Sequence, residues 1–281
     1  MDRTNFFSSF TQIKNSKMIK ISIITVNFNN LSGLQKTMKS VLCQRYTNME
    51  YIIIDGGSTD GSKEFIISHK DKLSYWCSEK DKGIYDGMNK GIAKVTGDYV
   101  LFLNSGDYFC SPLVLKEVFN SSPNDDLLIG RQCYYNRKGK KSIAWSIQAQ
   151  DINEHFFWSN TLPHQSTFIK TTLLNKIGGY NLDYHICADW AFWYEAIVEH
   201  KCTYSCIKNT ISYMEDWGIS SNMEKCRADM AKFLIKRHPT MTIEDWFEIN
   251  IQFSEALSFR RAYSSRISRL LMKIAIRLNK K

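Results

Sequence analysis

The stretch ISIITVNFNNLSGLQKTMKSVLCQRYTNMEYIIID, residues 21–55, decides the fold class of this 281-residue chain. Two runs rich in β-branched residues, ISIITVNF (21–28) and YIIID (51–55), are bounded by turn residues and predict strands. The segment between them, LSGLQKTMKSVLCQ (31–44), has the apolar spacing of a helix. The stretch therefore predicts a strand, helix, strand unit.

The same alternation continues along the chain. SKEFIISHK (62–70) and KGIYDGMNKGIAKV (82–95) are helical in pattern, whereas LSYWCS (73–78) and GDYVLFLN (97–104) are strand-like. Alternating units predict an α/β fold with a mostly parallel sheet and helices on both of its faces. In such sheets ligands bind beyond the carboxyl ends of the strands, where the loops gather.

Beyond about residue 110 the alternation becomes irregular. The segment HFFWSNTLPHQSTF (155–168) is rich in aromatic residues, and a helix is expected from about Ala188 to Glu199. We expect this half to form the pocket of a second substrate. Three parts are predicted: a loose extension (1–17), an α/β domain (18–225) and a helical region with a basic tail (226–281).

Composition and charge limit the classes of protein to which this chain can belong. Apolar residues make up 43% of the chain, which is enough for a substantial core, and no run approaches the ~18 apolar residues of a membrane-spanning helix. The N-terminus lacks the order of a secretory signal, so a cytoplasmic location is expected. The net charge is +9, but residues 256–281 hold eight Lys or Arg and no acid. Since the body is nearly neutral, nucleic-acid binding is not indicated.

The basic tail is amphipathic, and two interpretations remain open for it. Basic and apolar residues alternate in RISRLLMKIAIRLNKK (266–281) at the spacing of a two-faced helix. Such a helix can lie on an anionic bilayer, which would give a peripheral attachment at the inner face of the cell membrane. It can equally pack its apolar face on its own domain.

The cysteines do not indicate a metal site or a disulfide framework. The chain contains eight scattered cysteines, with one C-x3-C pair and no C-x2-C pair. We expect most of them to be small buried apolar residues.

Polar residues follow the strands at the points where a ligand is expected. In DGGSTDGS (55–62), Asp55 could accept hydrogen bonds from a ribose or a base, although an ordinary turn with a capped helix would look the same. In FLNSGD (102–107), Asp107 could bind a divalent cation together with phosphates, whereas the alternative is an Asx turn. Asp81 precedes a helix and could be only its N-cap.

The irregular half offers a candidate base. Asp189 in HICADWAFWYEAI (185–197) could deprotonate an acceptor hydroxyl, although helix capping alone would also explain it. The neighbouring Trp190 could belong to a sugar platform or to the core. His164, in LPHQSTF, could be functional or structural, and Ser-His-Asp chemistry is not supported because the chain lacks a G-x-S-x-G motif.

These motifs together resemble those of the family 2 inverting glycosyltransferases of the GT-A fold. The resemblance covers about residues 20–221 and is carried by a set of motifs in order: TVNFN (25–29), DGGSTDGS (55–62), SEKDKGIYDGMNKGI (78–92), FLNSGD (102–107), HQSTF (164–168), GGYN (178–181) and CADW (187–190). It implies a nucleotide-sugar donor, with a UDP-sugar expected, and a saccharide or lipid-linked saccharide acceptor in bacterial surface-polysaccharide synthesis.

The resemblance also implies roles for individual residues. Asp189 would be the catalytic base, and Asp107 would bind Mg²⁺ or Mn²⁺. His164, Gln165 and Trp190 would lie on the acceptor side, and Gly218 and Ser220 would lie near the donor diphosphate. The donor itself would be bound by Thr25, Asn27, Asp55, Asp81, Asn89 and Asn104.

The chain departs from the family pattern at one place. Many relatives have Asp-Ser-Asp-Asp where this chain has Asn104-Ser105-Gly106-Asp107, so metal binding would rest on Asp107. The Q-x-x-R-W motif of processive synthases is absent, which favours transfer of one sugar per encounter. Two alternatives remain: a non-catalytic nucleotide-binding or membrane-associated scaffold with the same fold, and a sugar-phosphate nucleotidyltransferase. The latter is disfavoured because NFNNLSG (27–33) is neither basic nor glycine-rich.

Overall fold

The computed structural model describes residues 18–135, 146–158, 160–215 and 223–240, together with 242 and 245. The predictions for the extension 1–17, for Gly218 and Ser220 and for the basic tail 256–281 lie outside the described residues.

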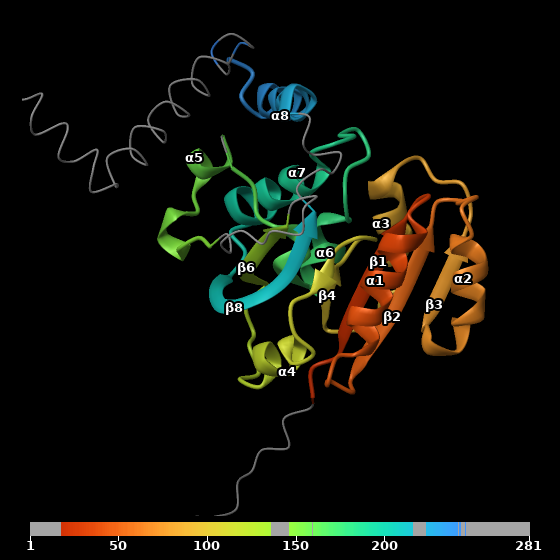
Figure 1. Cartoon of the computed structure of the whole chain (residues 1–281). Coiled ribbons are helices and arrows are strands. Elements are labelled where there is room, and N and C mark those ends of the chain that lie inside the picture. Colours follow the sequence, from red (N-terminus) through yellow and green to blue (C-terminus); the bar gives the residue numbers. More distant parts are fainter. Residues whose placement is uncertain are drawn as a thin grey trace, which may run out of the picture.

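The first half of the described chain alternates strands and helices as the sequence predicts (Figure 1). The elements are β1 (Ile21–Asn27), α1 (Leu31–Leu42), β2 (Met49–Asp55), α2 (Ser62–Ser68), β3 (Tyr75–Ser78), α3 (Ile84–Ile92) and β4 (Tyr99–Phe102). The strand, helix, strand prediction for residues 21–55 is therefore confirmed.

The second half is less regular, as expected. Its elements are β5 (Tyr108–Phe109), α4 (Val114–Phe119), β6 (Leu127–Tyr135), α5 (Glu154–Phe157), β7 (Thr167–Lys170), α6 (Thr171–Ile177), α7 (Ala188–Tyr194), β8 (Tyr204–Glu215) and α8 (Met223–Arg237). Short turns of 3-10 helix lie at Lys70–Lys72, Ala149–Asp151 and His164–Ser166. The helix expected from Ala188 is confirmed, and its continuation, Glu195–Glu199, is a π-helical turn.

The strands form one sheet in the order β3-β2-β1-β4-β7-β6-β8-β5. β1 pairs in parallel with β2 and β4, and β2 with β3, while β7 runs antiparallel to both β4 and β6. Because β7 is reversed, its amino end lies at the same edge as the carboxyl ends of β1, β2 and β4. The turn before β7 is thereby brought to the edge where a ligand is expected.

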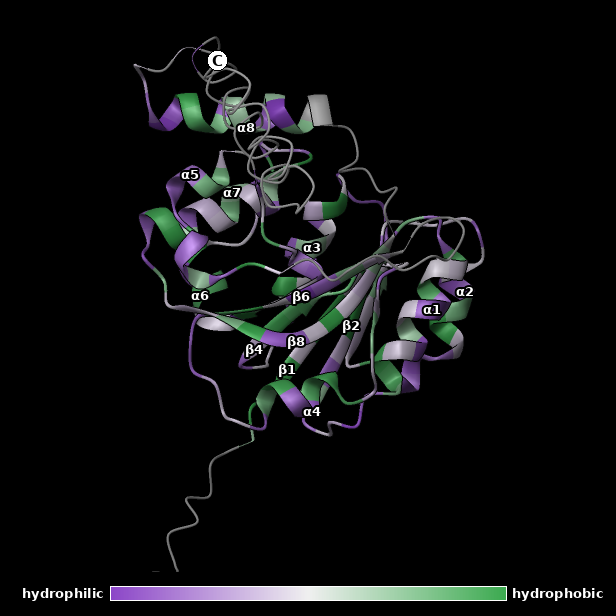
Figure 2. Ribbon diagram, turned by 60° about the vertical axis from the view of Figure 1, so that its left-hand side comes forward, coloured by the Kyte–Doolittle hydropathy of each residue, from purple (hydrophilic) through white to green (hydrophobic). Residues whose placement is uncertain are grey.

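The two faces of the sheet are buried by different helices (Figure 2). Along β1, Ile21 and Ile23 pack in a cluster with residues of α1, α2 and α4, whereas Ile24 and Val26 pack with residues of α3, α5, α6, α7 and α8. This alternation is the period-2 pattern of a strand covered on both sides. The prediction of helices on both faces is confirmed.

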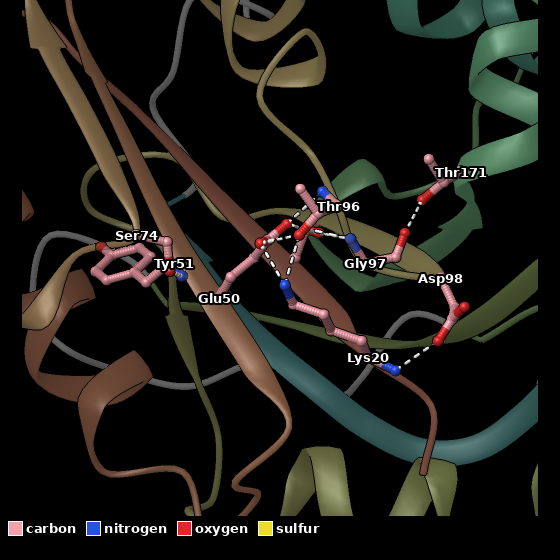
Figure 3. Close-up of polar contacts among 9 residues, drawn as sticks. Lys20, Glu50, Tyr51, Ser74, Thr96, Gly97, Asp98 and Thr171 are labelled. Carbon is pink, nitrogen blue, oxygen red and sulfur yellow. Dashed lines mark hydrogen bonds and ion pairs between the residues drawn. The ribbon is translucent and has the colours of Figure 1, made fainter. Parts of the chain in front are cut away.

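A buried carboxylate ties the strands together at the opposite, amino-terminal edge (Figure 3). Glu50 is 6% exposed and accepts hydrogen bonds from Ser22 at 2.5 Å and from Thr96, and it forms an ion pair with Lys20 at 2.9 Å. Burial acts to raise the pKa of Glu50, but these donors outweigh it and lower the pKa to about 2. The cluster joins the start of β2 to the segments that precede β1 and β4.

The cysteines are less buried than the composition suggested. Only Cys187, Cys202 and Cys226 are buried, so the expectation that most cysteines are buried is wrong. The others are half-buried or, in the case of Cys43 at the end of α1, exposed. No helix in the described part of the chain has the length and apolar character needed to cross a membrane.

Candidate active site

The predicted site residues gather at the carboxyl edge of the central strands. Asn27 and Asp55 are neighbours at the ends of β1 and β2, and Asp55 is in turn the neighbour of Ser78 at the end of β3. Asn104 and Asp107 follow β4, and His164 precedes the reversed strand β7. The fold thus brings five separate loops to one edge.

Asp55 is fully buried and accepts four hydrogen bonds. Oδ1 accepts from Asn27 at 2.7 Å and from the Ser58 hydroxyl at 2.6 Å, and Oδ2 accepts from the Ser58 amide at 3.0 Å and from Ser78 at 2.7 Å. Burial opposes ionisation, but these bonds outweigh it and lower the pKa of Asp55. The described contacts show that Asp55 and Asn27 shape the turn after β2, and their contact with a nucleotide stays a prediction.

Asp81 lies directly over this turn. A Cβ at Gly56 would be 2.7 Å from Oδ2 of Asp81 and 3.2 Å from Cδ2 of Phe28, so only glycine permits this approach. Oδ1 of Asp81 accepts a hydrogen bond from the Gly83 amide at 3.0 Å. Phe28 itself is 63% exposed, which is unusual for a large aromatic side chain. Phe28, Gly56 and Asp81 therefore form one surface beside the buried Asp55.

The loop Asn104–Asp107 is held from beneath by α1. The Thr37 hydroxyl accepts a hydrogen bond from the Gly106 amide at 3.0 Å and donates to the Asp107 carbonyl at 2.6 Å. The Asn30 side chain donates to the Ser105 carbonyl at 3.1 Å. Gly106 has φ = 106°, a conformation that side chains with a Cβ rarely adopt. The loop therefore favours glycine at this position.

Asp107 contributes a single carboxylate to this loop, and its binding of a cation stays a prediction. It is 7% exposed, and among the described residues no group of three or more His, Cys, Asp or Glu side chains could hold a metal. Mg²⁺ commonly uses only one or two carboxylates and takes its other ligands from phosphates and water. A single carboxylate at Asp107 is compatible with that mode of binding.

Asp189, in the first turn of α7, is surrounded by hydrogen-bond donors. Oδ1 accepts from the Trp190 amide at 2.9 Å and lies 2.8 Å from the Tyr85 hydroxyl, whose single proton is shared with the Ile186 carbonyl at 2.7 Å, while Oδ2 lies 3.1 Å from Nδ1 of His164. Burial acts to raise the pKa of Asp189, but the contacts with His164, Tyr85 and the Trp190 amide outweigh it and lower the pKa. The carboxylate is therefore ionised at neutral pH.

His164 and Gln165 are neighbours in sequence but face different surroundings. Nε2 of His164 lies 3.2 Å from Nδ2 of Asn104, so the imidazole joins the loop after β4 to Asp189. Gln165 is buried, and its amide contacts Gln132 of β6 at 3.3 Å and the sulfur of Met214 in β8. His164 belongs to the site, whereas Gln165 supports the sheet behind it.

Three other predicted residues have internal partners. Thr25 is fully buried and bonds to the Leu103 carbonyl at 2.8 Å, and Trp190 is 2% exposed with its indole nitrogen donating to the Phe157 carbonyl at 2.8 Å. Of the two interpretations of Trp190, the structure supports the core. Asn89 bonds to both the amide and the carbonyl of Tyr180, at 2.8 and 2.7 Å, and thereby holds the GGYN segment.

Two residues of the site were not predicted. These are Phe28, which lies in the motif TVNFN, and Tyr85, which lies on the apolar face of α3 and is 7% exposed. Tyr85 is the second residue of α3, whose N-cap is Gly83. Its place in the first turn of a helix that follows a strand was the available sequence signal. Nothing in the local pattern indicated its contact with Asp189, 104 residues away.

Several known proteins resemble this chain in sequence. The family model for glycosyl transferase family 2 matches residues 22–198. An uncharacterized glycosyltransferase of Mycobacterium tuberculosis is 33% identical over 219 residues, which cover 73% of this chain and 78% of the relative. A PGL/p-HBAD biosynthesis glycosyltransferase of Mycobacterium bovis is 29% identical and covers 61% of this chain and 67% of the relative.

Solved structures share the fold at low sequence identity. TarS of S. aureus, residues 1–349 in complex with UDP-GlcNAc, has a TM-score of 0.60 at 16% identity and covers 84% of this chain and 71% of that one. The mannosyltransferase PcManGT of Pyrobaculum calidifontis, in complex with GDP-Man and Mn²⁺, has a TM-score of 0.59 at 13% identity, covering 95% and 82%. With the family model spanning more than half of its length and a mixed α/β fold of the GT-A type, the chain belongs to glycosyltransferase family 2.

Proposed function

We propose that this glycosyltransferase moves one sugar per encounter from a UDP-linked donor to a hydroxyl of a saccharide acceptor, with inversion at the anomeric carbon. The observation that carries the proposal is an ionised carboxylate, Asp189, at the same sheet edge as the strand ends that would bind the nucleotide. TarS was crystallised with UDP-GlcNAc and PcManGT with GDP-Man, which supports a nucleotide-sugar donor here.

The proposed donor site has a nucleotide end and a phosphate end. The base would stack on the exposed ring of Phe28, beside Asp81 and Gly56. Asp55 and Asn27 would hold the turn that forms the floor of this pocket. The diphosphate would extend toward Asn104 and Asp107, because these residues follow β4, the neighbour of β1.

The geometry of Asp189 favours Oδ2 as the proton acceptor. Oδ1 accepts from the Trp190 amide and shares the single proton of the Tyr85 hydroxyl with the Ile186 carbonyl, while Oδ2 is approached only by His164 in the described contacts. The second lone pair of Oδ2 can accept the acceptor hydroxyl. That hydroxyl oxygen attacks the anomeric carbon, the bond to the nucleoside diphosphate breaks on the opposite face, and the hydroxyl proton passes to Oδ2.

The lowered pKa of Asp189 affects when the acceptor hydroxyl gives up its proton during the reaction. It keeps the side chain ionised, but it also makes the carboxylate a weak base. Proton transfer is therefore expected late, when attack has already made the hydroxyl acidic. A divalent cation, held by Asp107 and the donor phosphates, would supply charge stabilisation for the leaving diphosphate.

The acceptor is proposed to be lipid-linked and the protein to be peripheral at the inner face of the membrane. One relative is named for PGL/p-HBAD biosynthesis, and the chain ends in the basic amphipathic stretch 256–281. Both observations support an acceptor presented at an anionic lipid surface.

A donor screen tests the proposed function. Nucleotide release is followed with a panel of UDP-, GDP- and dTDP-sugars, with and without Mg²⁺ or Mn²⁺, and the anomeric configuration of the product is determined by NMR. We expect turnover with a UDP-sugar and an inverted product. Binding of donors with neither transfer nor hydrolysis would instead favour the non-catalytic scaffold, and a retained configuration would contradict the inverting mechanism.

A further inference from the structure

Four side chains from four separate segments form a continuous chain of contacts. Nδ2 of Asn104 lies 3.2 Å from Nε2 of His164, Nδ1 of His164 lies 3.1 Å from Oδ2 of Asp189, and the Tyr85 hydroxyl donates to Oδ1 of Asp189 at 2.8 Å. The chain runs from the loop after β4, through the turn before β7, to the first turns of α7 and α3. It therefore connects the donor-side loop to the candidate base.

The contacts determine which ring nitrogen of His164 carries the proton. Asp189 is ionised and can only accept, so Nδ1 of His164 must donate to it. In a neutral imidazole the other nitrogen, Nε2, is then an acceptor, and the group that faces it must be a donor. The amide nitrogen of Asn104 is such a donor.

An asparagine meets this requirement and an aspartate does not. A carboxylate at position 104 would have to accept from Nε2, so both ring nitrogens would be protonated between two carboxylates. An imidazolium would pair more strongly with Asp189 and make its oxygens less able to take a proton. Position 104 is therefore suited to a side chain that donates a hydrogen bond, as the asparagine amide does.

We propose that His164 is a positioning residue for Asp189 and that the Asn104 amide fixes its Nδ1–H tautomer. This inference rests on the proposed function, since it assigns the orientation of the proposed base. His164 directs Oδ1 toward Tyr85 and leaves the second lone pair of Oδ2 toward the acceptor. Both partners are only about one-sixth exposed, with side-chain exposures of 17% and 16%, so water competes little for their contact.

Two substitutions of His164 separate positioning from bulk packing. The amide nitrogen of asparagine can take the place of Nδ1, so His164→Asn keeps the donor to Asp189 and loses the contact with Asn104. The longer His164→Gln reaches toward Asn104 and removes the donor to Asp189. Because a misplaced base can cost about 100-fold, we expect kcat to fall about 100-fold in His164→Gln and less than about 10-fold in His164→Asn.

The donor KM is the internal control for these variants. His164→Gln keeps the contact with Asn104, the donor-side residue that His164 contacts in the described structure, so its donor KM should change less than about 3-fold. Thermal melting checks that both are folded. Equal losses of kcat in the two folded variants would overturn the positioning role, as would a selective rise of the donor KM.

A measurement on the protein without substrate tests the tautomer independently. Nitrogen-15 NMR of the histidine rings, with His164 assigned by comparison with His164→Asn, should show Nδ1 protonated and Nε2 unprotonated once the pH is high enough for the ring to be neutral. Asn104→Asp should protonate both nitrogens. A protonated Nε2 in the unsubstituted protein would overturn the inference even if transfer is observed, whereas absence of transfer with the expected tautomer would count against the proposed function alone.

Discussion

Oδ2 of Asp189 lies 3.1 Å from Nδ1 of His164, and this contact joins the amino end of α7 to the turn that precedes β7. Because β7 runs against its neighbours β4 and β6, the turn lies at the edge where the parallel strands end. The reversed strand is thus what places a histidine between the donor-side loop and the candidate base.

Phe28 is expected to contribute to donor binding through its exposed ring. Phe28→Ala should raise the donor KM about 5- to 150-fold, because stacking of a base on an aromatic ring contributes about 1–3 kcal/mol. Phe28→Tyr should retain the wild-type KM. Ile67→Ala, which truncates another exposed apolar side chain on α2, is the matched control. An unchanged donor KM in Phe28→Ala would show that the Phe28 ring is not part of the donor pocket.

Gly106 should not accept the aspartate that many relatives carry there. At φ = 106° a side chain with a Cβ is strained, so Gly106→Asp should lose about 1–3 kcal/mol of unfolding free energy, measured by denaturant titration. Ser105→Asp adds the same charge one residue earlier, where φ is not positive, and should lose less than about 1 kcal/mol. A Gly106→Asp variant as stable as the parent, with stronger Mn²⁺ dependence, would contradict this account.

Glu50 should make stability depend on acid pH. Its pKa falls from 4.5 to about 2 on folding, so its contribution is fully present above pH 4.5 and is lost as the pH falls toward 2. Glu50→Gln should lower the unfolding free energy by roughly 2–3 kcal/mol at pH 7, and by progressively less below pH 4.5. The exposed Glu64→Gln serves as control. If Glu50→Gln lowers the unfolding free energy by the same amount at every pH, packing and not ionisation of Glu50 explains the loss.

The basic tail is expected to bind anionic lipid. The full chain should co-sediment with vesicles containing phosphatidylglycerol and be released by salt, since each basic residue near the surface contributes about 1 kcal/mol. A variant that ends at Glu255 should not bind, and neither protein should bind neutral vesicles. Equal binding of both proteins to anionic vesicles would rule out the tail as the attachment.

The central fold could be predicted because its signals are local. The β-branched runs of β1 and β2 and the apolar spacing of α1 depend only on neighbouring residues, and the structure has them within two residues of the expected bounds. The reversal of β7 could not be predicted, because strand direction in the irregular half depends on packing between distant segments.

The site could be predicted in part for the same reason. Asp189, Asp81 and Asp107 stand out as carboxylates at the ends of elements, so their positions were foreseeable. The internal partners of Thr25, Asn89 and Trp190 were not, because a polar or aromatic residue near a strand end can face either a ligand or the core. Tyr85 shows the opposite case, in which a residue typical of the core donates to the candidate base.

The measurement that most directly tests the central claim compares the parent protein with Asp189→Asn. The amide keeps the size of the side chain and an oxygen for His164, but it cannot take a proton at neutral pH. We expect kcat to fall about 100- to 10,000-fold while the donor Kd, measured by calorimetry, stays within about 3-fold, and we expect the exposed Asp183→Asn to behave as the parent. An Asp189→Asn variant that retains most of the parent kcat would contradict the assignment of Asp189 as the base.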